Sequence, residues 1–388
     1  MVKLFSKTLL LFVLVGSNSI ANAQSISLTS GIKLPDSSLI KTSLLPALNG
    51  FIIELERPYK ENQYVDQSVL PETSALMDEL KNMDKNEKTH EKAFYKCTLN
   101  NAVKIDEGKY LIQISYLGIN DGYPVLKASF RLIAIKNGDS YIFKSPLKEN
   151  TLNWKSKTID NLTYFYKTES NTANAKQYQK TVALYDKKLG ANSLPIDFYY
   201  CDNFTEAQRI LGIDYKADYV GMKYNNFTSF ENGHNLMVNG WNDSTHRFDP
   251  HDLWHERLSN VMKSAIINRP VDEGCAYLYG GSWGFTWPQV LEKFKIYLQK
   301  NPNPNWLVLY TENKNFEDGP KVMKISYMLN ALLVNKIEKE KGFAPVLQLL
   351  ACGPREKGDE NYFNTLQKIA GIKKEDFNKI VNELVSQL

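Results

Sequence analysis

The chain of 388 residues contains five histidines, and two of them, His251 and His255, stand four positions apart. If the surrounding segment, FDPHDLWHERLSN, is helical, this spacing places both imidazoles on one face, where they can bind the same ion. Glu273 lies eighteen positions after His255, in a second segment of helical character, VDEGCAYLYGG. Two histidines and a carboxylate form a three-ligand zinc site that keeps its fourth position for water. We therefore predict a Zn²⁺ site at His251, His255 and Glu273.

Asp252 directly follows the first histidine of this pair. A carboxylate beside a metal-activated water can act as a general base, because it can take a proton from the water and pass it on. Aspartate is one methylene shorter than glutamate, so its oxygens would lie about an ångström farther from the water, and a displacement of that size can lower a rate about a hundredfold. We predict that Asp252 is a general base of reduced efficiency.

Together these residues resemble the signature of the gluzincin metallopeptidases, the clan of thermolysin and the zinc aminopeptidases. That signature is H-E-x-x-H, followed about twenty residues later by a helix with the third ligand, often as E-G-x-A-x-Y. Residues 273–277, EGCAY, are similar to the second part with the tyrosine one place early, and residues 251–255, HDLWH, have Asp in place of the family's Glu. The resemblance implies zinc ligation by His251, His255 and Glu273, and hydrolysis of a peptide or protein substrate with Asp252 as general base.

The same residues also have a structural interpretation without chemistry. Asp249 followed by Pro250 is typical of a helix N-cap and first helical residue, and Asp252 would then stabilise the free amides of the first turn. Glu273 would do the same in the second helix. A helix that begins at Pro250 also directs its positive end at the ion, which disfavours a cation. The alternative function is therefore a catalytically inactive peptidase-fold protein that binds a peptide or a surface ligand.

The elements around the motif extend the resemblance over roughly residues 176–388. Gluzincin-like peptidases close with a helical subdomain, in which a Tyr or His stabilises the oxyanion, and Tyr327 is the candidate here. In that family the strand before the metal helix forms the edge of the cleft. We predict helices at 176–189, 205–211, 287–299, 321–341, 344–350, 360–370 and 375–388, and strands at 196–201 and 234–238.

Other residues near the motif leave further options open. Trp283, Phe285 and Trp287 belong either to the core or to a substrate pocket, and a pocket of this kind would also suit a protein that binds carbohydrate or a surface. His234 and His246 either contact the site or lie at a cap or in solvent.

The region before residue 170 has period-two alternation, as in Tyr110, Ile112 and Ile114, which favours antiparallel strands. The polar run TESNTANA, residues 168–175, indicates a linker. The fold class is therefore α+β: an N-terminal antiparallel-sheet α+β domain at residues 24–170, followed by a gluzincin-like peptidase domain with a helical C-terminal subdomain at residues 171–388. In the first domain we predict a turn-rich start at 25–49, a short strand at 50–55, a helix at 71–83, and strands at 93–99, 109–117, 125–135, 141–143 and 161–167.

Residues 1–23 are typical of a cleavable signal peptide. Lys3 and Lys7 precede an apolar run at residues 9–15, and Ala-Asn-Ala ends at residue 23. We therefore expect a secreted or periplasmic protein with no integral membrane segment after signal cleavage. The formal charge of +4 falls to about +2 without these two lysines, and charges of both signs are interspersed, which excludes a nucleic-acid partner recruited by charge.

The four cysteines at positions 97, 201, 275 and 352 are far apart and form no C-x-x-C motif. An oxidising compartment would permit one or two disulfides, and the sequence does not choose among the pairings. Cys275 is either a nucleophile or, by default, a buried small apolar residue.

Overall fold

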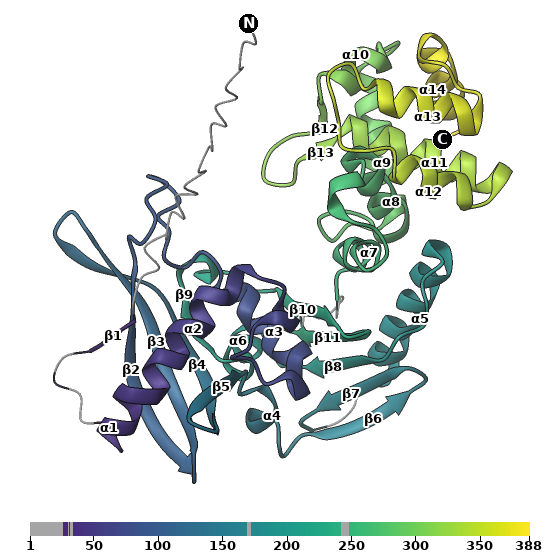
Figure 1. Cartoon of the computed structure of the whole chain (residues 1–388). Helices are drawn as coiled ribbons and strands as arrows, with labels where there is room; N and C mark the ends of the chain where they lie inside the picture. Colours follow the sequence, from purple (N-terminus) through teal and green to yellow (C-terminus); the bar gives the residue numbers. More distant parts are fainter. Residues whose placement is uncertain (1–25, 30, 32–33, 169–171, 242–247) are drawn as a thin grey trace, which may run out of the picture.

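The computed structural model of the protein describes residues 26–29, 31, 34–168, 172–241 and 248–388. Helices and mixed sheets are both present and the region after residue 250 is mainly helical, which confirms the predicted α+β class. Figure 1 shows two sheets in the first part of the chain and a lobe of helices beyond them. The predicted signal peptide at residues 1–23 lies outside the described residues.

The first sheet has the strand order β1-β2-β3-β4-β5, with β9 also paired to β4. Its longest ladder joins β3 to β4, from Lys109↔Ile135 to Asn120↔Tyr123. The predicted alternation is confirmed, because Tyr110, Ile112 and Ile114 are buried against the helices. The strands are β1 (Ser27–Leu28), β2 (Lys96–Asp106), β3 (Lys109–Asn120), β4 (Tyr123–Asn137), β5 (Ser140–Lys144) and β9 (Ile213–Lys216).

Helix α2 (Leu45–Ile53), preceded by α1 (Ser37–Leu39) and a π-helical turn at Ile40–Leu44, lies along one face of this sheet (Figure 1). Helix α3 (Leu70–Leu80) lies mainly against β10 (Asn226–Glu231) and β11 (His234–Asn239), and the short α4 (Leu147–Asn150) packs against α6 (Phe204–Leu211). The turn-rich prediction for 25–49 is therefore wrong for residues 37–49, which are helical, and the strand predicted at 50–55 is wrong, whereas the helix predicted at 71–83 is confirmed. Tertiary burial of Leu44, Leu48 and Phe51 overrides the strand preference of the Ile52-Ile53 pair.

Among the described residues, one helical stretch, Ser37–Glu56, has the length and apolar composition of a membrane-spanning helix. Leu44, Leu48 and Phe51 of this stretch are fully buried in the core beneath the first sheet. Packing inside the protein therefore accounts for its apolar character.

The second sheet has the order β10-β11-β8-β7-β6 and separates two cores. Phe198 and Met237 face α5 and the helical lobe, while Tyr199 and Val238 face the core of the first sheet. Because β7 pairs with β8, this sheet continues across the domain boundary predicted at residues 170/171. The strands are β6 (Lys155–Ile159), β7 (Leu162–Tyr166), β8 (Ile196–Tyr200), β10 (Asn226–Glu231) and β11 (His234–Asn239).

The helical lobe follows β11 and packs around the long helix α11, whose Leu329, Leu333 and Ile337 are buried. The predicted helices of this region are all present, within a few residues at their ends. Its elements, with the two helices that precede it, are α5 (Thr172–Leu189), α6 (Phe204–Leu211), α7 (Pro250–Ser259), α8 (Arg269–Gly280), α9 (Trp287–Lys300), α10 (Trp306–Thr311), β12 (Asn315–Glu317), β13 (Met323–Lys324), α11 (Ile325–Lys341), α12 (Ala344–Leu350), α13 (Glu360–Ala370) and α14 (Phe377–Val385).

None of the four cysteines, all of which lie among the described residues, belongs to a disulfide, so none of the pairings left open by the sequence is formed. Cys275 is fully buried in α8, and burial raises the pKa of its thiol well above the usual range. A buried neutral thiol is a poor nucleophile. Cys275 is therefore a packing residue.

Candidate metal centre

Helix α7 carries both histidines and is fixed at its start and in its second half. Asp249 is its N-cap, and the carboxylate accepts a 2.9 Å hydrogen bond from the backbone N–H of His251. Farther along, the buried Arg257 donates two hydrogen bonds, of 2.8 and 3.0 Å, to Asp186 of α5 and one of 2.9 Å to the side chain of Asn235 in β11. These contacts hold the helix, and with it the two imidazoles, against α5 and the second sheet.

Helix α8 carries Glu273 and approaches its neighbours through two glycines. A Cβ added to Gly274 would lie 2.6 Å from Cβ of Asn330 on α11, and one added to Gly280 would lie 2.4 Å from the backbone nitrogen of His251. Only glycine permits backbones this close. Since Asp272 is the acidic residue of the first turn of α8 and Glu273 follows it, helix capping does not account for Glu273.

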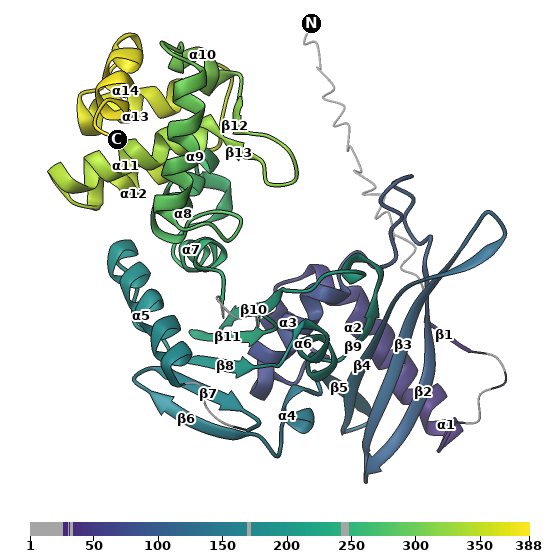
Figure 2. The same cartoon turned by 180° about the vertical axis from the view of Figure 1, so that it is seen from behind.

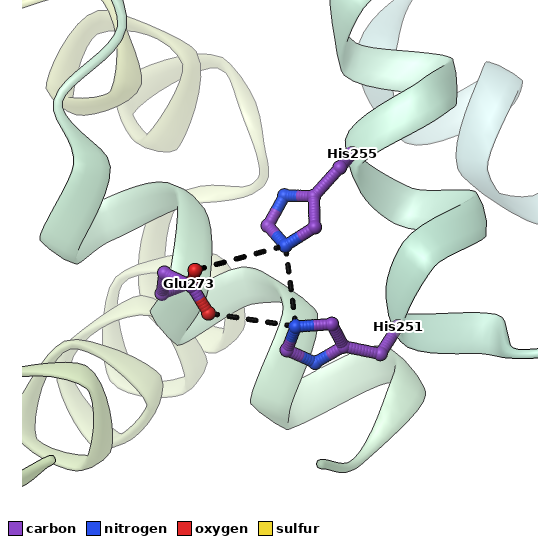
Figure 3. A group of neighbouring side chains, drawn as sticks. All are labelled: His251, His255 and Glu273. Atoms are coloured by element: carbon purple, nitrogen blue, oxygen red, sulfur yellow. Dashed lines mark hydrogen bonds and ion pairs between the residues drawn. The ribbon is translucent and has the colours of Figure 1, made fainter. Parts of the chain in front are cut away.

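His251, His255 and Glu273 converge between α7 and α8 (Figure 3). The two Nε2 atoms are 3.2 Å apart, His251 Nε2 is 3.4 Å from Glu273 Oε2, and His255 Nε2 is 4.0 Å from Oε1. Bonds of about 2.0–2.1 Å to a tetrahedral zinc ion place ligand atoms roughly 3.3 Å apart. The first two separations are close to this value, and one ligand atom from each of the three residues lies within 4.8 Å of the others. The cluster can therefore hold a metal ion.

Contacts at the other ring nitrogens fix the tautomers of both histidines. His251 Nδ1 lies 2.7 Å from the carbonyl oxygen of Gly281, and His255 Nδ1 lies 2.8 Å from Oδ1 of Asp272. These oxygens accept hydrogen bonds, so each Nδ1 carries the proton and each Nε2 presents a lone pair. Two lone pairs and a carboxylate that face one another repel unless a cation or a proton lies between them. Contacts of the same kind orient metal-binding histidines in general.

Asp272 and Arg269 contact the candidate ligand residues on the side away from the cluster. Asp272 is buried, accepts a 3.1 Å hydrogen bond from Trp254 Nε1, and lies 3.3 Å from the Arg269 guanidinium. Arg269 also donates to Oε1 of Glu273, which leaves Oε2 as the oxygen nearest His251. Burial would raise the pKa of Glu273, but the two histidines and Arg269 outweigh burial and lower it. The carboxyl group of Glu273 is therefore ionised at neutral pH.

The start of α7 points its positive end at the site, because His251 lies in its first turn. This end would repel a cation. Two carboxylates, Asp249 and Asp252, lie at the same helix end and line the same cleft as His251. Burial, together with the charge of Asp252, raises the pKa of Asp249. Negative charge on this acidic pair reduces the repulsion between the helix end and a cation.

A cleft of about 840 Å³ opens beside His251 and Glu273. Asp252 lines it with an exposed side chain, and Tyr327, near the start of α11, lines it with a half-buried ring. Burial and the charge of Glu273 raise the pKa of Tyr327, so its hydroxyl stays protonated and can donate a hydrogen bond. The two residues predicted to be catalytic thus share one cleft with His251 and Glu273. The remaining lining comes from several segments: Met222, Tyr224, Asn225, Trp241, Asp249, Tyr277, Ser282, Trp283, Gly284, Lys321, Val322 and Lys324.

The other sequence candidates are divided between the cleft and positions away from it. Of the three aromatic residues after α8, Trp283 lines the cleft, whereas Phe285 and Trp287 pack against the helical core. His234 lies 3.2 Å from Asp197 on the second sheet and does not line the cleft. His246 lies outside the described residues.

The strand before the metal helix is not at the sheet edge, which corrects one expectation from the resemblance. β11 lies between β10 and β8, because a hairpin that closes at Glu231↔His234 adds β10 on the outside. The edge is therefore β10. Tyr224 and Asn225, which lead into β10, line the cleft.

Sequence reasoning missed the residues that support the ligands. Arg269 and Glu273 have the spacing of a helical ion pair, and Asp272 directly precedes Glu273, so this part of the network was detectable in principle. The carbonyl oxygen of Gly281 and the side chains of Lys321 and Lys324 reach the site only through tertiary packing.

No protein-family model matches this chain, and no curated protein sequence is similar to it. The comparisons therefore assign this chain to no family, and the candidate site is described from its geometry alone.

Proposed function

We propose that the protein is an exported zinc metallopeptidase of gluzincin-like type. The observation that carries this proposal is the convergence of two histidine Nε2 atoms and one carboxylate, from two helices, beside an open cleft. This donor set suits Zn²⁺, with three protein ligands and a free fourth position. A zinc ion bound there would make a water more acidic and polarise the carbonyl of a peptide bond.

Two residues of the chain would carry out the proton transfer and the charge stabilisation. The exposed carboxylate of Asp252 would take a proton from the attacking water and deliver it to the leaving amine. The protonated hydroxyl of Tyr327 would donate a hydrogen bond to the oxygen on which negative charge develops. Both assignments rest on their shared position in the cleft with His251.

The proposal is tested by metal analysis and by peptide hydrolysis with the purified full-length protein. We expect about one zinc ion per chain, lost in His255→Ala, and zinc-dependent cleavage of a peptide library. Asp252→Asn should abolish cleavage while zinc stays bound, and Asp252→Glu should increase cleavage, because the longer side chain restores the usual reach of the base. Asp376→Asn, at an exposed position between α13 and α14, is the matched control. Absence of zinc from the purified protein and after addition of zinc would refute the proposal.

A second candidate is a catalytically inactive peptidase-fold protein that holds a peptide in the same cleft. It is favoured by the short side chain at position 252 and by the guanidinium of Arg269 on Glu273, which supplies a positive charge without a metal. A protein that binds peptides equally well with and without a chelator, and cleaves none, would have this function.

A further inference from the structure

Two lysines line the cleft, and neither is paired with an acidic residue in the part of the chain that the structure describes. Lys321 and Lys324 line it together with His251 and Glu273. Nearby lysines of the lobe are paired, for example Lys293 with Glu317 at 3.2 Å. Within the described ranges neither Lys321 nor Lys324 lies in an ion pair with a carboxylate. Their positive charges are therefore available to a ligand.

Lys321 is held at the rim of the cleft by two loops. It lies in the loop between β12 and β13, which projects from the helical lobe (Figure 2). Its Nζ atom donates a 3.1 Å hydrogen bond to the carbonyl oxygen of Trp283, and Trp283 Nε1 donates one of 2.8 Å to the carbonyl oxygen of Val322. The ammonium also lies 4.4 Å from the centre of the Phe285 ring. One of its three protons is thus used, and the others can bind an acceptor.

A row of aromatic rings lies between Lys324 and His251 of the candidate metal site. Its Nζ atom lies 5.4 Å from the centre of the Tyr327 ring. That ring meets Tyr277 edge-on at 5.8 Å, and Tyr277 lies 6.0 Å from the His251 ring. Lys324 is also the N-cap of the seventeen-residue helix α11 and has no side-chain hydrogen bond there. The positive end of that helix adds to the charge of the lysine.

Acidic and basic residues therefore line different sides of the cleft. Asp249, Asp252 and Glu273 lie on the side of α7 and α8, and the two lysines come from β13 and the loop before it. A carboxylate on a ligand would be repelled by the first side and attracted by the second. A volume of about 840 Å³ lies within the range of clefts that enclose a ligand the size of a short peptide.

From this arrangement we propose that Lys321 and Lys324 form a carboxylate-binding subsite, which selects peptides that carry a carboxylate close to the bond at the metal. The selection of peptides for cleavage rests on the proposed peptidase function. The binding of a carboxylate by the two lysines does not depend on that function. The carboxylate comes from an acidic side chain or from the C-terminus of the peptide, and the two sources present the same two oxygens to the lysines.

The experiment uses the zinc-loaded full-length protein and three series of short acetylated peptides: neutral with an amidated C-terminus, neutral with a free C-terminus, and amidated with one glutamate. Binding is measured by isothermal titration calorimetry and cleavage by steady-state kinetics. We expect peptides of at least one carboxylate-bearing series to bind about tenfold more tightly than neutral amides, with the effect in KM rather than kcat. The preferred series identifies the source of the carboxylate.

The variants Lys321→Gln and Lys324→Gln should each remove most of this preference, measured as the ratio of the affinities for carboxylate-bearing and neutral peptides. Lys368→Gln, at an exposed position on α13 outside the cleft, should leave the preference intact. Equal binding of all three series, or an unchanged preference in both cleft variants, would overturn the subsite. Preferential binding without any cleavage would support the subsite and contradict the peptidase proposal, so the two can fail separately.

Discussion

Asp272 Oδ1 lies 2.8 Å from Nδ1 of His255, and Asp272 directly precedes the third residue of the cluster, Glu273. One short stretch of α8 therefore supplies a proposed ligand and the carboxylate that orients another ligand. The same oxygen accepts a hydrogen bond from Trp254, which fixes its position. The orientation of His255 thus depends on a residue that the metal would not touch.

The first prediction concerns this carboxylate. Asp272→Ala removes the acceptor for His255 Nδ1 and should lower zinc affinity about 10–100-fold, because the imidazole loses its fixed orientation and tautomer. Competition with a chromogenic chelator measures the dissociation constant. The exposed Asp376→Ala serves as control, and an unchanged zinc affinity in Asp272→Ala would show that the contact has no role in ligation.

The second prediction concerns the close contact between α8 and α7. Gly280→Ala places a methyl group 2.4 Å from the backbone nitrogen of His251, so the start of α7 must move. We expect zinc affinity to fall at least tenfold, since ligand positions matter on the scale of an ångström. The same chelator competition applies, with the exposed Ser259→Ala on α7 as control. Wild-type affinity in Gly280→Ala would contradict the packing argument.

The third prediction concerns the buried ion pair that anchors α7. The side chains of Arg257 and Asp186 are 1% and 6% exposed, so removal of either leaves a buried charge without its hydrogen-bonded partner, and Arg257 then keeps only Glu256, at 4.0 Å, as an acidic neighbour among the described residues. Asp186→Ala or Arg257→Leu alone should lower the free energy of unfolding by about 3–5 kcal/mol, and the double variant should lose less than the sum. Urea denaturation of the metal-free protein measures these values, and simple additivity would argue against coupling.

The fourth prediction is that the metal-free and zinc-loaded proteins respond to pH in opposite directions. Burial lowers the pKa of His251, but Glu273 and the Gly281 carbonyl outweigh burial and raise it. In the metal-free protein the resulting stabilisation is complete below the unfolded pKa of about 6.5 and is lost as pH rises through the folded pKa. Zinc binds the neutral imidazole, so the stabilisation of the folded protein by zinc increases as pH rises through the folded pKa of His251.

Thermal unfolding between about pH 5.5 and 8.5, with zinc or with a chelator, checks this prediction. The increase in Tm caused by zinc should grow with pH across this range. In metal-free Glu273→Gln the decline in stability should begin at lower pH, because the main group that raises the pKa of His251 is gone. A zinc effect that is constant with pH would contradict the assignment of His251 as a ligand.

The sequence by itself determined the α+β class, most helices after residue 176 and the three residues that could hold a metal ion. These features are local: His251 and His255 share a helix face because of their spacing, and Asp249-Pro250 starts that helix through capping. The strands β3 and β4 were predictable for the same reason, since their alternation is set by the pleat.

Tertiary structure alone decided the rest, because it depends on contacts between distant segments. The apolar stretch at 37–56 is helical because it is buried beneath the first sheet, and β6 and β7 join β8 across a polar run that was expected to divide two domains. The tautomer of His251 depends on the carbonyl of Gly281, thirty residues away, and the position of Lys321 depends on Trp283. Hydrogen bonds of this kind have no period along the chain, so only the folded backbone brings their partners together.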